Sequence, residues 1–413
     1  MTTNKGKLTL VLLLGYHSLL IAQNTWTTYT TSNSGISGNH LNVVKIDGHQ
    51  KKWIGTSSSD TRGSLNIFND TSWVIYNVDN SSYPGENNYD MAIDANDTKW
   101  IGTSSGLVKF ESNGGWTLFS KFNSGLPDNH IRCIQIDSDG NKWIGTDKGG
   151  LAFFDDNSWV VYDTVNSQIP YNEVACIGID HNDIVWTGHN GAFATFDGTN
   201  WTVTNTPGGS GVSAFYVDEN NNIWTAYYST VRKYDGSQWT SYHSNNWGAS
   251  FDFIQSITKD LTGNIWIGTT QSGLVKFTGT DWEVFDTSNS GITSNFIFSI
   301  AIDGNNQKWI ATDNGLAVLK ESVVNSISKK KSKVSTFEIY PNPASDNVTI
   351  DFSSFTDRVN FIFVKNIVGE EVKSYQPKGE KRFQFSTSFL PSGIYTVELA
   401  MNETILQQKL VIK

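Results

Sequence analysis

Tryptophan recurs in this chain with a nearly fixed period, and that period constrains the fold more than any other feature. A Trp followed by Ile or Thr, then by Gly or Ala, occurs at Trp53, Trp100, Trp143, Trp186, Trp224, Trp266 and Trp309. A second series is formed by Trp26, Trp73, Trp116, Trp159, Trp201, Trp239 and Trp282. Self-similarity of this kind indicates seven copies of one structural unit.

Each unit has the pattern of four short antiparallel strands. In the third unit, alternating apolar residues occupy Ile131–Ile136, Lys142–Thr146, Leu151–Phe154 and Trp159–Tyr162, with Gly, Asn and Asp between them. Half-buried strands joined by tight turns produce this alternation. Four strands in a unit of about forty residues are typical of a β-propeller blade. The predicted fold class is all-β, a seven-bladed β-propeller over residues 23–320 followed by a small Ig-like β-sandwich.

The phase of the repeat predicts how the ring closes. The repeats begin on a strand of the second Trp series, Trp26–Tyr29, and end on a third strand, Leu316–Leu319. The first strand of the chain would then supply the fourth strand of the last blade. Such closure removes the open edge at which a ring would come apart.

The third unit carries a motif that is specific for a known repeat. Gly125-Leu126-Pro127-Asp128-Asn129-His130-Ile131 precedes Gly140-Asn141-Lys142-Trp143-Ile144-Gly145-Thr146 and Gly150-Leu151. This run resembles the two-component regulator propeller repeat, and the resemblance extends over about residues 26–320. In that family, paired propellers often form the glycan-responsive sensors of hybrid histidine kinases. We do not expect the signalling role here, because no membrane span or kinase follows the propeller.

Residues 1–22 have the form of a secretory signal peptide. Lys5 and Lys7 precede the apolar run Leu8–Leu14, and a more mixed segment follows. We expect cleavage between Ala22 and Gln23, with an uncleaved anchor as the alternative. The apolar run is short for a membrane span, and no other stretch is long enough, so none is expected in the mature chain.

The composition changes after the last repeat. Residues 321–336 are rich in Ser, Val, Asn and Lys and indicate a solvated linker. Residues 337–413 alternate between apolar and polar, with breaks such as Pro391-Ser392-Gly393, as in a small β-sandwich. Together with the opening Ile339–Ala344 and the ending Lys409–Lys413, these features resemble the type IX secretion C-terminal sorting domain. The resemblance implies the type IX translocon as a partner, export through the outer membrane, and release or attachment at the cell surface. An Ig-like binding module is the alternative.

Charge and motif content exclude several classes of function. Thirty basic against 40 acidic residues give a net charge of −10, which argues against nucleic acid or an anionic membrane as partner. Two cysteines cannot form a disulfide framework or a cysteine-based zinc site. Metal-protease, nucleophile-elbow and phosphate-loop motifs are missing from the sequence. We therefore expect no cofactor, no metal and no catalysis.

The periodic residues are interpreted as structural. A tryptophan required in every blade is most simply a core residue, although sugars also stack on indoles. An aspartate stands six residues before every first-series Trp, at Asp47, Asp94, Asp137, Asp180, Asp218, Asp260 and Asp303. We interpret these as turn residues rather than calcium ligands, because the distal Glu of a calcium loop is missing. Cys133 and Cys176 occupy equivalent positions and are predicted to be buried thiols rather than a disulfide.

Recognition is expected on the propeller face that carries the variable loops. Trp247 breaks the period and lies in one of these loops beside His243 and Asp252. It is predicted to be a stacking platform for a sugar or a peptide aromatic, with a loop-packing anchor as the alternative. Further predicted ligand-binding residues begin inner strands at the same rim: His40, Asn129, His130, Asn172 and Glu173.

The sequence thus predicts an exported, secreted or surface-attached binding protein for a glycan or an envelope protein. One alternative is a polysaccharide lyase or glycosidase, with Lys45, Asp90, Arg132 and Tyr216 as the inner-strand positions for acid–base chemistry. Another is an accessory component of the type IX secretion machinery.

Overall fold

The computed structural model describes residues 24–57, 63–84, 86–249, 252–321, 337–353, 359, 361–366, 371–377, 380–400 and 405–413. The predicted signal peptide and residues 322–336 of the predicted linker lie outside this part. The chain divides into two compact units, Met1–Val323 and Val324–Lys413. All regular structure in the described residues is β-strand apart from two 3-10 turns, so the all-β class is confirmed.

Seven four-stranded antiparallel sheets make up the described part of the first unit. The first three are β2 (Leu41–Ile46), β3 (Lys52–Thr56), β4 (Leu65–Phe68), β5 (Trp73–Tyr76); β6 (Asn88–Ile93), β7 (Lys99–Thr103), β8 (Leu107–Phe110), β9 (Trp116–Phe119); and β10 (Ile131–Ile136), β11 (Lys142–Thr146), β12 (Leu151–Phe154), β13 (Trp159–Tyr162). The next three are β14 (Cys176–Ile179), β15 (Val185–His189), β16 (Ala192–Phe196), β17 (Trp201–Asn205); β18 (Val212–Val217), β19 (Ile223–Tyr227), β20 (Thr230–Tyr234), β21 (Trp239–His243); and β22 (Ile254–Lys259), β23 (Ile265–Thr269), β24 (Leu274–Phe277), β25 (Trp282–Phe285). The last sheet is β26 (Ile297–Ile302), β27 (Lys308–Thr312), β28 (Gly315–Lys320) and β1 (Thr25–Tyr29).

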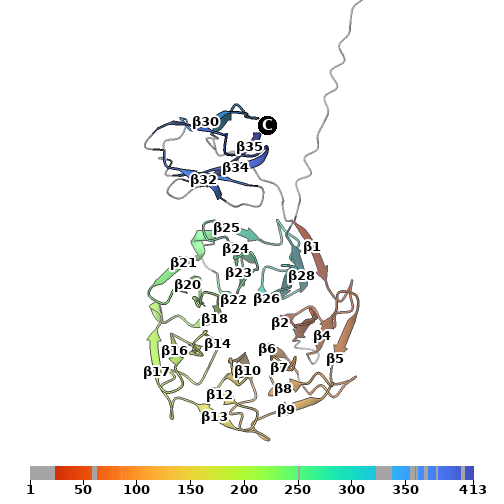
Figure 1. The fold of residues 1–413 in the computed structure, drawn as a ribbon. Coiled ribbons are helices and arrows are strands. Elements are labelled where there is room, and N and C mark those ends of the chain that lie inside the picture. Colours follow the sequence, from red (N-terminus) through yellow and green to blue (C-terminus); the bar gives the residue numbers. More distant parts are fainter. Residues whose placement is uncertain are drawn as a thin grey trace, which may run out of the picture. The chain divides into compact units, whose positions relative to one another are not determined.

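The sheets form a closed ring (Figure 1). The first strand of each sheet contacts the first strand of the next in the cycle β2, β6, β10, β14, β18, β22, β26 and back to β2. These inner strands surround the axis, and the fourth strands lie at the circumference. The chain therefore contains a β-propeller, built from the units that the tryptophan period delimits.

The N-terminal strand closes the ring. Strand β1 pairs antiparallel with β28 along its whole length, with Trp26 opposite Leu319 and Tyr29 opposite Leu316. The Tyr29 ring also packs against Trp73 of the first sheet, 5.6 Å between ring centroids. Residues from the two ends of the repeat region thus share one sheet, as the phase of the repeat predicts.

Each first-series Trp and the aspartate six residues before it form one structural unit. The indole Nε1 donates to that aspartate in all seven sheets, at 2.8–3.4 Å. The other carboxylate oxygen accepts the backbone N–H groups two and four residues further on, for example those of His49 and Lys51 at Asp47. The interpretation of these aspartates as turn residues is confirmed, and the turn is also tied to the buried indole.

Four buried lysines join neighbouring blades, and their role was not foreseen from the sequence. Each immediately precedes a first-series Trp, is at most 3% exposed, and places its ammonium 4.4–4.9 Å from the indole of the preceding blade: Lys52 over Trp309, Lys99 over Trp53, Lys142 over Trp100 and Lys308 over Trp266. A desolvated ammonium over an indole face contributes about 2 kcal/mol. The remaining blades have Val185, Ile223 and Ile265 at this position.

The glycine two residues after the Trp allows the next blade to approach. A Cβ on Gly102 would lie 2.6 Å from Ile131, which is on the adjacent inner strand. A Cβ on Gly268 would lie 2.7 Å from Ile297 in the same way. Any side chain at these two positions would push the blades apart, and this explains the glycine there. Two other blades have Ala226 and Ala311 at the equivalent position.

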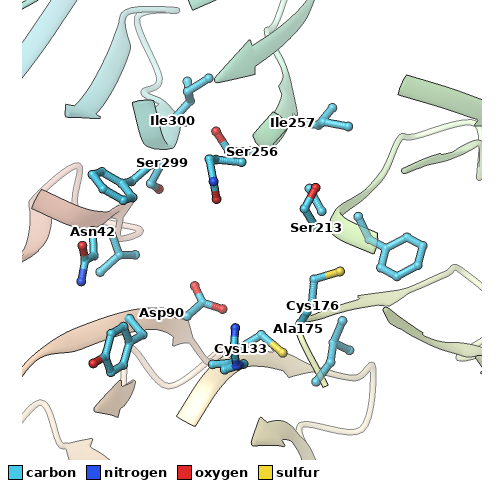
Figure 2. Close-up of a pocket in the computed structure, with 18 of the residues that line it drawn as sticks. Asn42, Asp90, Cys133, Ala175, Cys176, Ser213, Ser256, Ile257, Ser299 and Ile300 are labelled. Carbon is cyan, nitrogen blue, oxygen red and sulfur yellow. The ribbon is translucent and has the colours of Figure 1, made fainter. Parts of the chain in front are cut away.

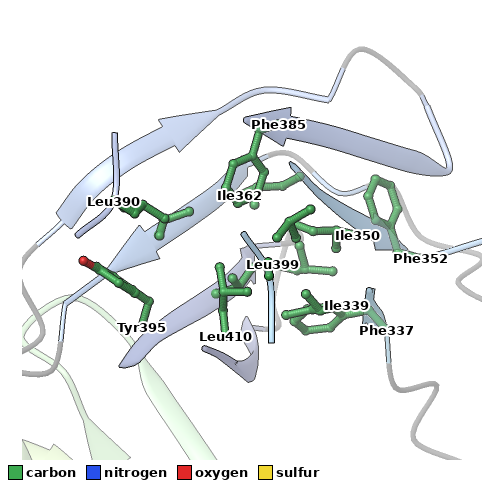
Figure 3. Close-up of a cluster of buried hydrophobic side chains, with 14 of the residues drawn as sticks. Phe337, Ile339, Ile350, Phe352, Ile362, Phe385, Leu390, Tyr395, Leu399 and Leu410 are labelled. Carbon is green, nitrogen blue, oxygen red and sulfur yellow. The ribbon is translucent and has the colours of Figure 1, made fainter. Parts of the chain in front are cut away.

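The C-terminal unit has two sheets around one core (Figure 3). One sheet has the order β29 (Glu338–Tyr340), β30 (Asn347–Asp351), β33 (Arg382–Ser386), and the other β32 (Glu371–Tyr375), β31 (Phe361–Lys365), β34 (Gly393–Ala400), β35 (Ile405–Ile412). Alternate residues of both sheets, such as Ile350, Phe385, Ile362 and Leu410, meet in one buried cluster. The alternation in the sequence is therefore that of strands with one buried face. The Ig-like topology remains a prediction.

Deleting β1 is expected to destabilise the ring. A chain that begins at residue 32 loses the pairing to β28 and the rings of Trp26 and Tyr29, whereas a chain that begins at residue 23 keeps them. The deletion removes two half-buried rings and the whole pairing with β28. Because these losses together amount to about 3 kcal/mol or more, we expect the thermal midpoint of the shorter chain to fall by about 10 °C. Equal midpoints would contradict closure by β1.

Two lysine variants distinguish the energy of the cation–indole contact from the cost of leaving a buried aspartate without its lysine. Lys142→Met leaves Asp156, whose side chain is 58% exposed, whereas Lys308→Met leaves Asp260, which is fully buried. We expect a loss of about 1 kcal/mol in the free energy of unfolding for the first and of about 3–5 kcal/mol for the second. Urea titration of both variants measures the difference, and equal losses would show that the buried carboxylate needs no counter-charge.

Candidate binding site

A bulge in the inner strands directs one side chain per blade toward the axis. The register of β2 against β3 shifts between Leu41 and Val43, and equivalent shifts occur in β6, β10, β18, β22 and β26. Such a shift leaves one residue unpaired. The unpaired residues stand eleven positions before a first-series Trp: Asn42, Tyr89, Arg132, Ser213, Gln255 and Phe298. In the fourth blade this position is Ala175, immediately before β14.

All seven of these residues line a central cavity of about 770 Å³. Every inner strand contributes to it, and residues of the adjoining rim such as His40, His130 and Phe296 line its mouth. Figure 2 shows Asn42, Asp90, Cys133 and Ser213 around the open space. The volume is in the range of ligand pockets. The periodic position that lines it carries a different type of side chain in almost every blade, as a recognition surface requires.

The floor of the cavity holds a lysine and a carboxylate from neighbouring blades. Lys45 Nζ lies 3.6 Å from Asp90 Oδ1. The same carboxylate accepts the backbone N–H of Met91 at 2.8 Å and that of Ile134, in the next blade, at 2.9 Å. Asp90 therefore joins two inner strands, and its lone pairs are largely occupied.

A clamped arginine stands at the mouth. The Arg132 guanidinium is 2.8 Å from Asp147 and 3.1 Å from Glu173, which comes from the next blade. Burial by itself raises the pKa of Asp147, but the hydrogen bond and charge of Arg132 outweigh it and lower that pKa overall. Two carboxylates therefore surround one guanidinium at the mouth.

A histidine and an aspartate meet at the ring closure. His40 Nδ1 lies 2.5 Å from Asp313 Oδ1, and the His40 ring packs against Phe298 at 4.9 Å between centroids. A carboxylate only accepts hydrogen bonds, so the proton lies on Nδ1 and, in the neutral ring, Nε2 is an acceptor. Both residues line the cavity.

Aromatic rings form two separate walls of the mouth. Phe296 stacks on Phe298 with centroids 4.4 Å apart, in the last blade. The rings of Tyr89 and His130 stack at 4.6 Å with an interplanar angle of 16°. Flat apolar faces of this kind, interspersed with amides and hydroxyls, suit the mixed polarity of a sugar ring.

The two cysteines line the cavity as free, buried thiols, as the sequence predicts. Each sulfur lies 3.6 Å from a carbonyl oxygen of the next blade, Val174 for Cys133 and Val212 for Cys176. Burial raises the pKa of both thiols well above its usual value. They are therefore protonated at neutral pH and are poor nucleophiles.

The structure separates the predicted rim residues into two groups. His40 and His130 line the cavity, and Glu173 binds Arg132 at its mouth. Asn129 and Asn172 have a local role, since each accepts the backbone N–H eight residues earlier, from Lys121 and from Thr164 at 2.9 Å. Asn39 and Asn295 make the same bond in other blades, and this shows that it belongs to the repeat.

The prediction that Trp247 is a stacking platform is wrong. Its side chain is only 7% exposed, and its ring packs against Trp282 at 5.1 Å. In the corresponding loops Ile36, Tyr83, Leu126 and Ile292 pack beside the second-series Trp. In its own loop the Trp247 indole occupies this place beside Trp282, which agrees with the alternative that Trp247 anchors the loop by packing.

Its two predicted neighbours also have local roles. Asp252 is fully buried, and its carboxylate accepts the backbone N–H groups of Thr270, Gln271 and Ser272 at 2.8–3.1 Å. The ring Nδ1 of the exposed His243 lies 3.0 Å from the Thr230 hydroxyl. Neither residue lines the central cavity.

Three of the four residues proposed for acid–base chemistry, Lys45, Asp90 and Arg132, line the same cavity, and each is engaged in an ion pair. Lys45 and Asp90 bind each other, and Arg132 is held by two carboxylates. Tyr216 is not among the cavity residues, and burial, with the nearby charges of Glu219 and Asp218, raises its pKa to about 12. Spacing in the sequence did not reveal the His40 and Asp313 pair, because its members are 273 residues apart.

Asp47, His49 and Asp97 have ligand atoms within 4.8 Å of one another, on the side of the aspartate turns. Lys99 Nζ is 3.5 Å from Asp47 and 2.7 Å from Asp97, so a lysine already supplies the positive charge there.

None of the helices in the described part of the chain is long and apolar enough to span a membrane.

Two family models match the chain. Residues 338–413 match the secretion system C-terminal sorting domain, and residues 125–148 match the two component regulator propeller. Both predicted resemblances are confirmed. A sorting domain of this kind implies export by the type IX system to the outer membrane or cell surface. Comparison with curated proteins gives no match.

Solved structures with the same fold include proteins of different functions. PorZ, a surface component of the type IX secretion system of Porphyromonas gingivalis, matches at 15% identity and a TM-score of 0.59, over 93% of this chain and 61% of that one. The extracellular domain of the putative hybrid two component system BT3049 from B. thetaiotaomicron matches at 19% identity and 0.63, over 94% and 57%. The chain thus spans less than two thirds of either. Virginiamycin B lyase from Staphylococcus aureus matches at 13% identity and 0.61, over 72% and 100%. At these identities the likeness shows the fold.

Replacing Trp247 is expected to affect stability and not recognition. Trp247→Ala empties a buried site and should lower the free energy of unfolding by about 3–5 kcal/mol, while Trp247→Phe should lower it less. Denaturant titration measures both losses. A ligand that binds Trp247→Phe as it binds the unchanged chain supports a packing role, and a selective loss of binding would restore the stacking role.

Proposed function

We propose that this protein is an exported, surface-located binding protein that holds a glycan in the central cavity of its propeller. The observation that carries this proposal is a ring of seven residues, six at bulges and Ala175 at the equivalent position, whose side chains of differing chemistry line one space of about 770 Å³. The tryptophans, aspartates and glycines that build the blades recur with the period, whereas the inner-strand residues around this space differ from blade to blade, as residues that contact a ligand can.

The chemistry of the lining supports a carbohydrate. Phe298 and the stacked rings of Tyr89 and His130 offer apolar faces. Asn42, Gln255 and Ser213 supply amides and a hydroxyl within the same ring. Sugars have apolar faces and a hydroxyl edge, and a binding site for them combines both kinds of group. A protein partner with an extended surface would instead be expected to bind to the outer loops of the propeller and to leave the cavity empty.

The sorting domain supports the location of this activity. Residues 338–413 match a secretion sorting domain, and the propeller resembles a surface component of that system in its fold. A role as accessory component of the machinery would show itself differently, because deletion of the gene would then block the export of other proteins carrying such domains.

One observation favours an enzymatic second candidate. Asp313 fixes the protonated Nδ1 of His40, so Nε2 is set to accept a proton at the cavity mouth. A base oriented by a carboxylate is the arrangement required for proton abstraction in a lyase. A binding protein would bind the same glycan without changing it.

A glycan array with the full chain tests the proposal. We expect the unchanged chain to bind, and Phe298→Ala to bind about tenfold more weakly because it loses a stacking face. The matched control is Phe122→Ala, which removes a phenyl ring that is 82% exposed and outside the cavity lining. Chromatography of the bound glycan after incubation detects turnover, which would establish the lyase. Silence from the unchanged chain would contradict a glycan ligand and favour an envelope protein, to be sought by cross-linking on intact cells.

A further inference from the structure

The permanently charged basic groups of the cavity are all neutralised by the protein itself. Among the described residues that line the cavity, only Lys45 and Arg132 carry a permanent positive charge. Lys45 lies 3.6 Å from Asp90, and Arg132 lies 2.8 Å from Asp147 and 3.1 Å from Glu173. Each cation thus already has a carboxylate of the protein beside it, which offsets its attraction for a carboxylate, sulfate or phosphate of a ligand.

Negative charge exceeds positive charge around the cavity. The two cations face Asp90, Asp147 and Glu173, and Asp313 adds a fourth carboxylate at the mouth. Asp313 is half-exposed and Glu173 is 45% exposed, so their charge acts on a solute that enters. The mouth also holds His40, bound to Asp313, and His130, stacked on Tyr89. These two rings and the two permanent cations do not outnumber the four carboxylates, so the cavity carries no net positive charge in any state of the rings. A net charge of −10 on the whole chain acts in the same direction at longer range.

Groups that recognise uncharged ligands are abundant in the same space. Asn42 and Gln255 stand at bulges, and amides both donate and accept hydrogen bonds. The Asn42 Nδ2 donates to the Asn88 carbonyl at 2.8 Å, so its Oδ1 is the atom that can accept from a ligand hydroxyl. Gln135 and Ser213 add a third amide and a hydroxyl. The aromatic walls require no charge on the ligand. An uncharged sugar can therefore bind without displacing an existing ion pair, whereas an acidic sugar must displace one or lie beside carboxylates that outnumber the permanent cations.

We propose that the cavity selects uncharged sugar residues, hexoses or N-acetylhexosamines, and excludes glycuronates and sulfated or phosphorylated sugars. Glu173 and Asp313 are the specificity-determining residues, and they act by repelling anions at the mouth. This inference rests on the proposed function, since it specifies the class of glycan that the same site takes.

Matched pairs of oligosaccharides test the inference on the full chain. Glucose-terminated and glucuronate-terminated oligomers of equal length differ by one carboxylate, and calorimetry gives the affinity for each. We expect the neutral oligomer to bind about tenfold or more tightly than the acidic one. We also expect the affinity for the neutral oligomer to change little between about 0.05 and 0.5 M salt. Screening of charge–charge interactions becomes strong over this range, and a neutral ligand has no charge to be screened.

Variants show whether the two carboxylates cause the selectivity. Glu173→Gln and Asp313→Asn each remove one negative charge, and the difference between neutral and acidic oligomers should become smaller in both. Asp281→Asn removes one negative charge from an exposed turn outside the cavity lining and should leave the difference unchanged.

The outcomes separate this inference from the function on which it rests. If neither oligomer nor any other sugar on an array binds, the proposed function fails. If the acidic oligomer binds as tightly as the neutral one or more tightly, the glycan function stands and the selectivity for uncharged sugars is wrong. If the selectivity is found but Glu173→Gln, Asp313→Asn and Asp281→Asn all leave it unchanged, the assignment to the two carboxylates is wrong.

Discussion

The hydrogen bond from each first-series indole to the aspartate six residues earlier is the interaction on which the blades depend. It joins the turn after an inner strand to the buried ring of the next strand, so the length of the hairpin and the register of the first two strands are fixed together. Burial by itself raises the pKa of Asp260, but hydrogen bonds from Trp266, Asn264 and Thr262 outweigh it and lower that pKa overall. The carboxylate therefore stabilises the fold above its unfolded pKa near 4, and this stabilisation is lost as pH falls through the lower folded value.

A second constraint acts between blades. The lysine beside four of these indoles lies over the indole of the preceding blade, and the glycine after the indole admits the next inner strand. Lysine is seldom fully buried, and its position here is compatible with the core only because an indole face and a carboxylate surround the ammonium. Because the lysine–indole and glycine contacts hold the blades together, the bulged residues are not needed for packing between blades. They line the axis, where their chemistry can vary without cost to the blade.

The site was only partly accessible from the sequence. His40, His130 and Glu173 were found because they begin inner strands, and strand order places such residues at one rim. Trp247 was misassigned because a departure from the Trp period was interpreted as freedom from packing, whereas the indole packs against Trp282 in its own loop. The bulges were missed, since a shift of one residue between paired strands leaves no mark on composition. The position eleven residues before each Trp, with a different side chain type in almost every blade, was the signal that could have revealed them.

The sequence by itself determined the repeat, the four strands of each unit, closure by the first strand, the free thiols and the sorting domain, because all of these depend on periodicity or on short contiguous motifs. Only the tertiary structure decided which side chains face the axis and which charges neutralise one another. His40 meets Asp313, and Arg132 meets Glu173, across blade boundaries that bring distant residues together. Ring closure sets the distance between His40 and Asp313, and packing of consecutive blades sets the distance between Arg132 and Glu173. Neither distance is encoded in a local pattern of residues.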